Sequence, residues 1–443
     1  MTSLTLRPAE ATREELPALA WSFLYFFSLL AGYYVLRPIR DEMGLQLGPK
    51  ALQELFTWVF VSMLVLVPVF GWLTRLVPRR QLLPWLYGFF MLNLLAFAWV
   101  FDAGGQQSPV LARVFFVWVS VFNLFVISVF WSFMADLFDT GQAKRFYGFI
   151  SAGGTLGALV GPTLTATLVE WIGPQWLLRV SAGFLGLAVI AILRLRAWAR
   201  ATGAAGQAAD PGEHEAMKGS VFSGLVDVVR SRYLLSLCVF LLGYTLLSTF
   251  LYFLSADAIP KAVTNSLERT KLLAQVDLAV NVLALVLQVV AFKGLITRLG
   301  TRFVLGLLPL VSVVGFVVLA LAWPALWALV AFGVVRRAGE YALTKPARET
   351  LYNVLPADQK YRAKNVIDTL VHRTGDTASA WIFGGLRGLS LTAPQIAWVS
   401  AVIAVGWWIV SQSLGRRAQA LQAEAEPRPV RSLGGREKGS RWA

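Results

Sequence analysis

The chain has 443 residues, of which 57% are hydrophobic and only 15% are charged, and its mean hydropathy is +0.62. Soluble globular proteins are about 45–50% apolar and about 25% charged, so this composition excludes an ordinary soluble domain and indicates an integral membrane protein. The formal net charge is +15. The basic residues lie mainly in short stretches between apolar runs, as in the cytoplasmic loops of membrane proteins, so we do not interpret the charge as nucleic-acid binding. The single cysteine, Cys238, excludes an intramolecular disulfide.

Apolar runs of about 20 residues recur along the chain, which is the length that crosses roughly 30 Å of hydrocarbon as a helix. Backbone groups in lipid must be hydrogen-bonded within the segment, so these runs are predicted to be helices. The predicted fold is an all-α integral membrane protein of about twelve transmembrane helices. Their predicted bounds are 17–37, 52–74, 82–101, 111–137, 146–171, 175–197, 233–258, 271–292, 302–323, 324–345, 364–388 and 394–414.

A polar stretch rich in alanine and glycine, 201–220, is the longest interruption of the apolar pattern and divides the helices six and six. Directly after it, apolar residues from Val221 to Val229 fall on one helical face and predict a short interfacial helix. The predicted parts are a cytoplasmic N-terminus (1–16), an N-terminal half (17–197), a cytoplasmic linker with the interfacial helix (198–232), a C-terminal half (233–414) and a basic, disordered tail (415–443).

Lysine and arginine gather in the connections after the even-numbered helices, which predicts that both termini are cytoplasmic. The expected location is a bacterial inner membrane. The connections after helices one and seven break this trend. We interpret their charges as lining a solute pathway (Arg37, Arg40, Lys50, Lys261, Arg269 and Lys271).

The two halves share a nine-residue motif. Gly71-Trp-Leu-Thr-Arg-Leu-Val-Pro-Arg79 and Gly294-Leu-Ile-Thr-Arg-Leu-Gly-Thr-Arg302 are identical at five of nine positions, about half the chain apart. Six spans return the chain to its starting side, so the copies predict a parallel repeat about an axis along the membrane normal, as in the major facilitator superfamily. The motif also resembles the basic signature that this superfamily carries after helices two and eight. It is either a gating turn or a basic loop that follows the charge rule, and we favour a gating role for its arginines, Arg75, Arg79, Arg298 and Arg302. Lys144 and Arg145, ahead of helix five, are predicted to act in the same gate.

Helix ten carries three ionisable residues near its centre, where a charge costs roughly 2.5–3.5 kcal/mol on insertion scales. Arg336 and Glu340 are four residues apart and are therefore predicted to face one side and to neutralise each other in part. Arg337 lies beside them. They could form a structural ion pair between helices, but one glutamate cannot satisfy two arginines, so we favour the lining of a solvated cavity.

Helix eleven carries Asp368, His372 and Asp376 at a spacing of four, with Arg373 beside them. Histidine titrates near neutrality, so Asp368 and His372 are candidates for proton coupling. The same residues could instead form a structural polar contact between helix eleven and helix ten.

Several motifs resemble the ATP/ADP translocase family of plastids and intracellular bacteria: Leu36-Arg-Pro-Ile-Arg-Asp-Glu-Met43, Phe130-Trp-Ser-Phe-Met-Ala-Asp136, Gln142-Ala-Lys-Arg-Phe-Tyr147, Glu340-Tyr-Ala-Leu-Thr-Lys-Pro-Ala-Arg-Glu349 and Arg362-Ala-Lys-Asn-Val-Ile-Asp368. The resemblance implies a nucleotide exchanger of the major facilitator fold. It implies that Arg40 takes the place of the family's cation after helix one and Asp136 that of its acidic residue at the end of helix four. In helix eleven the chain departs from the family, because Gly375-Asp-Thr-Ala378 replaces a segment whose lysine transport needs, and Asp376 reverses that charge.

Together these patterns predict a secondary transporter that works by alternating access on an anionic solute such as ATP or ADP. It is expected to act as a monomer in the lipid bilayer, without enzymatic activity, cofactor, metal or nucleic-acid partner. Two alternatives remain: a major facilitator-type transporter of another metabolite or drug, coupled to protons, and a non-transporting scaffold or sensor. The predicted substrate-binding residues are Arg37, Arg40, Asp136, Asp277, Arg336, Arg337, Glu340, Lys345, Arg373 and Asp376.

Overall fold

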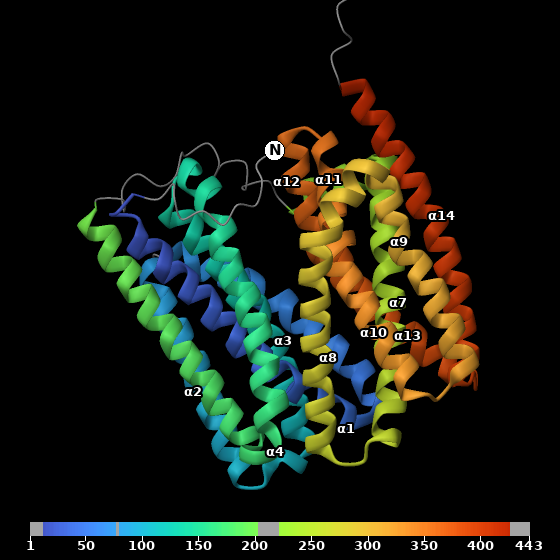
Figure 1. Ribbon diagram of the computed structural model, residues 1–443, viewed down its shortest axis with the longest axis horizontal. Coiled ribbons are helices and arrows are strands. Elements are labelled where there is room, and N and C mark those ends of the chain that lie inside the picture. The colour runs from blue at the N-terminus through green and yellow to red at the C-terminus, as the bar shows by residue number, and fades with distance from the viewer. Residues whose placement is uncertain (1–11, 77–78, 203–220, 426–443) are drawn as a thin grey trace, which may run out of the picture.

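The computed structural model describes residues 12–76, 79–202 and 221–425, and within these ranges the chain is helical, with no strand (Figure 1). The first part contains α1 (Leu16–Leu76), α2 (Arg79–Asp102), α3 (Pro109–Leu137) and α4 (Thr140–Ala201). The second part contains α6 (Val221–Arg230), α7 (Arg232–Ala262), α8 (Ser266–Val286), α9 (Lys293–Ala322), α10 (Leu326–Gly339), α11 (Lys345–Leu351), α12 (Ala357–Asn365), α13 (His372–Gly388) and α14 (Ala393–Ala425). Three π-helical turns lie between them: η4 (Leu287–Phe292), η5 (Glu340–Thr344) and η7 (Val366–Val371).

Three of the helices are each divided by a glycine with a positive φ: Gly48 in α1 (79°), Gly173 in α4 (74°) and Gly300 in α9 (78°). Such a backbone conformation is open to glycine because it has no Cβ. A continuous helix of 61 residues, the length of α1, would be about 90 Å long, three times the hydrocarbon thickness. Each glycine therefore separates two membrane spans.

Twelve membrane-crossing segments follow within the described ranges. Seven helices are long and apolar enough to cross a bilayer, and three of them are the ones divided by glycine. The remaining two spans are α10–η5–α11 and α12–η7–α13, whose charged side chains lower their hydropathy. The predicted all-α membrane fold is confirmed.

The largest errors in the predicted boundaries lie at two places. Helix one does not end at Arg37: it continues through Pro38 as far as the turn at Gly48, so Arg37 and Arg40 lie within a helix rather than in a connection. Proline is tolerated inside membrane helices where neighbouring groups satisfy the freed backbone. At the other end of the chain, α14 extends to Ala425, so the first part of the predicted disordered tail is helical, and 426–443 lie outside the described residues.

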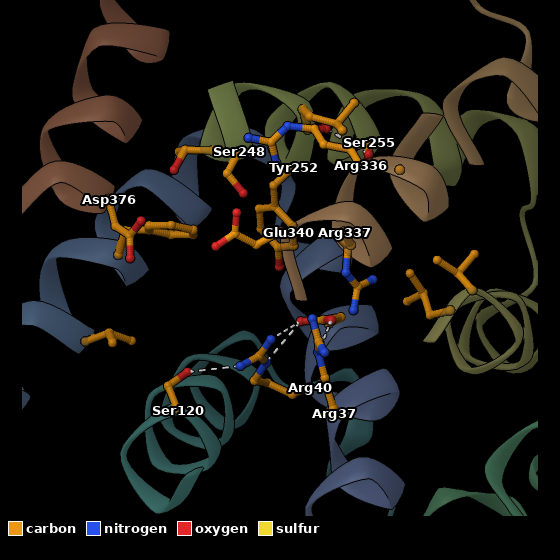
Figure 2. Close-up of a pocket in the computed structure, with 18 of the residues that line it drawn as sticks. Arg37, Arg40, Ser120, Ser248, Tyr252, Ser255, Arg336, Arg337, Glu340 and Asp376 are labelled. Atoms are coloured by element: carbon orange, nitrogen blue, oxygen red, sulfur yellow. Dashed lines mark hydrogen bonds and ion pairs between the residues drawn. The ribbon is translucent and has the colours of Figure 1, made fainter. Parts of the chain in front are cut away.

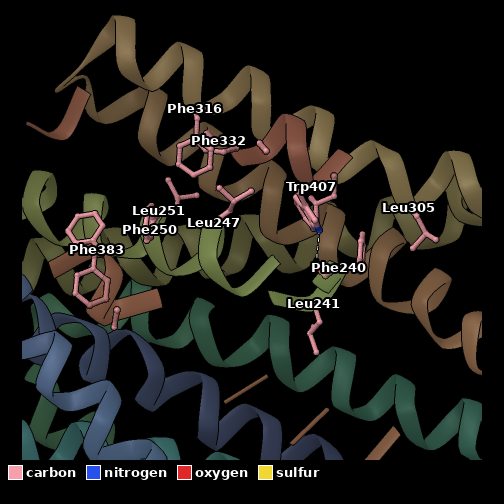
Figure 3. Close-up of a cluster of buried hydrophobic side chains, with 14 of the residues drawn as sticks. Phe240, Leu241, Leu247, Phe250, Leu251, Leu305, Phe316, Phe332, Phe383 and Trp407 are labelled. Carbon is pink, nitrogen blue, oxygen red and sulfur yellow. Dashed lines mark hydrogen bonds between the residues drawn. The ribbon is translucent and has the colours of Figure 1, made fainter. Parts of the chain in front are cut away.

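The chain packs around two hydrophobic cores, which Figure 1 shows as a blue-to-green bundle beside a yellow-to-red one. One core is formed by residues of α1 to α4. The other is formed mainly by α7 to α14, and Figure 3 shows its aromatic centre, where Trp407 Nε1 donates to the carbonyl of Phe240 at 2.8 Å. Large apolar side chains also cover the outside of both bundles, for example Trp85 and Trp171, which are 80% and 86% exposed. Such surfaces suit contact with lipid.

Within the first bundle, small residues of α4 lie directly against the backbone of α1. A Cβ added at Gly153, Gly157 or Gly161 would come within 2.5, 2.4 and 2.7 Å of a main-chain oxygen of α1. This is the close helix contact that small residues at a spacing of four permit in membranes.

We expect Gly157→Ala to destabilise the protein by about 1–3 kcal/mol, the range for overpacking, because its Cβ would clash with Phe27 O and Ala31 N. Gly148→Ala in the same helix is the matched control, since nothing lies within 4 Å of its added Cβ. The helix propensity of alanine should leave that variant as stable as the wild type or more stable. The measurement is thermal unfolding in detergent, and equal melting temperatures for the two variants would contradict the packing argument.

Candidate functional site

A cavity of about 360 Å³ lies between the two bundles (Figure 2). Residues of α1 and α3 line it on one side, and residues of α7, α8, α10, η5 and α13 line it on the other. Besides many apolar side chains, its lining contains five arginines and three carboxylates, an excess of positive charge in an otherwise apolar protein: Arg37, Arg40, Arg336, Arg337 and Arg373, with Asp41, Glu340 and Asp376.

On the side of the first bundle, Arg40 is held by Asp41 and α3. Its Nε and Nη2 donate to Asp41 Oδ1 at 3.0 and 2.5 Å, and its Nη1 lies 3.5 Å from Ser120 Oγ. The guanidinium also stands 5.1 Å from the ring centre of Phe116. These contacts fix the guanidinium at the cavity wall, where 15% of the side chain remains exposed.

Asp277 joins the two bundles at the same depth. Arg337 of α10 donates to its Oδ1 at 2.6 Å, and Arg37 Nε of α1 lies 3.6 Å from its Oδ2. The Asp277 side chain is only 3% exposed and does not itself line the cavity. Figure 2 shows Arg337 extending toward Arg37 and Arg40, so three arginines gather around two carboxylates.

Arg336 and Glu340 do not form the ion pair that their spacing predicts. Arg336 is 1% exposed, donates to the Tyr244 carbonyl at 3.1 Å and stands 5.2 Å from the ring centre of Tyr244. Its Nε and Glu340 Oε2 are both buried without a hydrogen-bond partner among the described residues. Glu340 opens the π-helical turn η5, and Figure 2 shows its carboxylate within the pocket, on the side toward Asp376.

The predicted stripe on helix eleven is interrupted. His372 Nδ1 lies 3.3 Å and Arg373 Nη1 3.8 Å from Asp376 Oδ2, and all three residues line the cavity. Asp368 instead pairs with Arg348 at 3.2 Å and is not part of the lining. Asp368 lies within the π-helical turn η7, whereas His372 and Asp376 belong to α13, which follows it.

The other predicted site residues lie away from the cavity. Asp136, near the end of α3, and the exposed Lys345 do not line it. Of the predicted gating residues, Arg302 Nε donates to Gln412 Oε1 at 2.8 Å, while Lys144 and Arg298 are exposed. The side chains of Arg75 and Arg79 lie outside the described part of the structure.

Arg145 lies 3.1 Å from Glu15 Oε1 and thereby ties α4 to the start of α1. Burial disfavours the charged form of Glu15. Hydrogen bonds from the Thr12 backbone and Gln142, with the charge of Arg145, outweigh this and hold the pKa of Glu15 below its ordinary value.

Sequence reasoning missed the polar side chains of α7. Tyr244, Ser248, Tyr252 and Ser255 all line the cavity, and their spacing of four, four and three places them on one helical face. That periodicity in an apolar span was the available signal.

Polar contacts also join the bundles at the end where Gly48 and Gly173 lie. Arg269 of α8 makes hydrogen bonds of 2.7–3.0 Å to the Glu42 carboxylate of α1, and both side chains are buried. Arg269 also donates to the carbonyls of Val263 and Thr264. Outside this pair, Lys271 reaches Glu170 at 2.6 Å.

Comparison with known proteins decides the family. Residues 22–339 match the family described as Major Facilitator Superfamily. The chain belongs to this superfamily. It is therefore a secondary membrane transporter and not an enzyme.

Solved structures share the fold of this superfamily member. A bacterial homologue of the iron transporter ferroportin in an inward-facing state aligns with a TM-score of 0.62 and 15% identity, over 92% of this chain and 99% of the other. A point mutant of the nucleoside transporter NupG aligns at 0.57 and 13%, over 92% and 100%. The POT family transporter PepTSo aligns at 0.59 and 12%, over 93% and 99%. No curated protein matches the sequence significantly.

We expect Asp277→Asn to destabilise this transporter by up to about 3–5 kcal/mol, because it leaves two partly buried arginines without their shared, buried carboxylate. Glu170→Gln is the matched control. It also removes one carboxylate between the bundles, but from a pair whose side chains are 36% and 38% exposed, so its cost should stay below about 1 kcal/mol. Thermal unfolding in detergent measures both, and a similar loss for the two variants would refute the difference.

Proposed function

We propose that this transporter moves a small anionic solute through the cavity by alternating access. The observation that carries the proposal is the surplus of arginine at mid-depth. Five arginines face three lining carboxylates, and the addition of Asp277 behind them still leaves one cation in excess. Guanidinium groups pair with carboxylates and phosphates through several parallel donors, and ionisable groups cost most at this depth of the membrane.

A nucleotide is the finer proposal, supported by the resemblance to the ATP/ADP translocases. Asp376 weighs against a polyphosphate, since it lines the cavity where that family has a lysine. His372 and Arg373 lie beside its carboxylate and reduce its repulsion of an anion. ATP and ADP therefore belong among the solutes to be tested first.

The proposed orientation places both termini on the cytoplasmic side of a bacterial inner membrane, with the protein acting as a monomer. The contacts around Glu42 and Arg269 then close the outer end, while the bundles stand apart toward the end that carries the termini (Figure 1). The conformation would be inward-facing. Alternating access requires that the Glu42–Arg269 pair separate when the outer end opens.

Arg40→Gln is expected to reduce the initial rate of exchange about tenfold or more, because a hydrogen bond to a charged group contributes about 1.5–3 kcal/mol. The assay is counterflow of labelled ATP, ADP, phosphate or small dicarboxylates into proteoliposomes preloaded with the unlabelled solute. Arg416→Gln removes an exposed arginine far from the cavity lining and is the control. The absence of counterflow for every anion would reject the proposed function.

Glu42→Gln should open the outer end more often. A Ser248→Cys probe in the cavity would then react faster with a membrane-impermeant thiol reagent added from outside. The background is low because the single native cysteine, Cys238, is buried. Glu170→Gln on the same probe is the control for a surface pair, and equal labelling of both variants would contradict a gating role for Glu42.

A further inference from the structure

The cavity contains two unlike charge environments. Toward α1, Arg37, Arg40 and Arg337 share Asp41 and Asp277, which leaves one positive charge. Toward α13, the positive and negative charges of the lining residues cancel, but not every charged side chain there has an ion-pair partner. Asp376 lies near His372 and Arg373, whereas Arg336 and Glu340 form no ion pair with any described residue.

An unpaired arginine and an unpaired glutamate are both costly at this depth. Arg336 is 1% and Glu340 7% exposed, and each retains a buried polar atom without a partner among the described residues. A buried polar group that lacks its hydrogen bond costs about 1–3 kcal/mol, and more when it is charged. Because they lie four residues apart, at the end of α10 and the start of η5, and do not satisfy each other, a solute that contacts both would need an acceptor for Arg336 and a donor for Glu340.

An anion without a donor fits this arrangement poorly. It would be attracted by the arginines but repelled by Glu340, which stands within the pocket. A cationic group on the solute removes that repulsion and supplies the donor that Glu340 Oε2 lacks. The excess positive charge near Arg37 then accepts a second acid group.

The volume of the cavity suits a small solute. At about 360 Å³ the cavity is near the lower end of the range of about 300–1,000 Å³ for small-molecule sites. We infer that the cavity binds a small solute with two acid groups and one ammonium group, the chemistry of acidic and phosphorylated amino acids, with its ammonium on Glu340 and one acid group on Arg336. This inference rests on the proposed transport of anions and names the solute class within it.

The test uses two pairs of probes that differ only at the amine. L-aspartate is compared with L-malate, and O-phosphoserine with 3-phosphoglycerate, since a hydroxyl replaces the ammonium in the second member of each pair. We expect the intact transporter in proteoliposomes to exchange at least one amine-bearing probe about tenfold faster than its partner, because a site built around a polar group rejects the analogue that lacks it.

Glu340→Gln keeps the shape of the side chain and removes its charge. It should abolish this discrimination by slowing exchange of the amine-bearing probe to the rate of its amine-free partner, and thermal unfolding in detergent shows that the variant is folded. Arg336→Gln should slow both members of the pair, and Arg416→Gln should slow neither.

Three results would overturn the inference: equal exchange within both pairs by the wild type, unchanged discrimination in Glu340→Gln, or exchange of nucleotides with neither amine-bearing probe. If Glu340→Gln keeps the discrimination but loses uptake driven by a pH gradient, Glu340 carries a proton and the inference also fails. None of these results contradicts the proposed transport of a small anionic solute. Loss of counterflow for every anion, nucleotides included, would instead reject the proposed function itself.

Discussion

The arrangement of the transporter depends on one buried carboxylate. Asp277 lies between Arg37 of the first bundle and Arg337 of the second, at distances of 3.6 and 2.6 Å, with 3% of its side chain exposed. In a low-dielectric interior, two arginines without this partner would each carry a large desolvation cost, and together they would repel each other. The ion cluster therefore holds α1, α8 and α10 together at the depth where the solute is expected to bind.

The interface between the bundles combines this ion cluster with apolar packing. Most of the hydrophobic packing lies within each bundle, around two separate cores. The contacts between the bundles join polar pairs, chiefly Asp277 with its arginines and Glu42 with Arg269, to apolar packing such as that of Phe56 in α1 against the rings of Tyr252 and Phe253 in α7. Polar contacts of this kind have discrete partners that can separate and be replaced, which is what rocking of two rigid bundles requires. An anionic solute at Arg37 or Arg337 would compete directly with Asp277.

Irregular helix geometry is concentrated in the second bundle. Three π-helical turns interrupt its spans, and η5 and η7 fall directly beside site residues, at Glu340 and before His372. An extra residue per turn shifts the faces of the helix on either side of it. Asp368, within η7, pairs with Arg348, whereas His372 of α13 lies beside Asp376, so spacing alone was a poor guide to which ionisable side chains meet.

The sequence by itself determined the number of spans, the all-helical fold and the presence of ionisable residues at the centres of helices ten and eleven. Hydropathy and repeat length decide these properties locally, because each span must satisfy its own backbone in lipid. Only the tertiary structure decided the partners. It paired Asp277 with arginines from two other helices and left Arg336 and Glu340 without an ion pair. It also placed the polar side chains of α7 against the cavity. Side-chain pairing depends on the relative rotation of helices distant in sequence, and neither composition nor spacing encodes that rotation in a form that can be read from one chain.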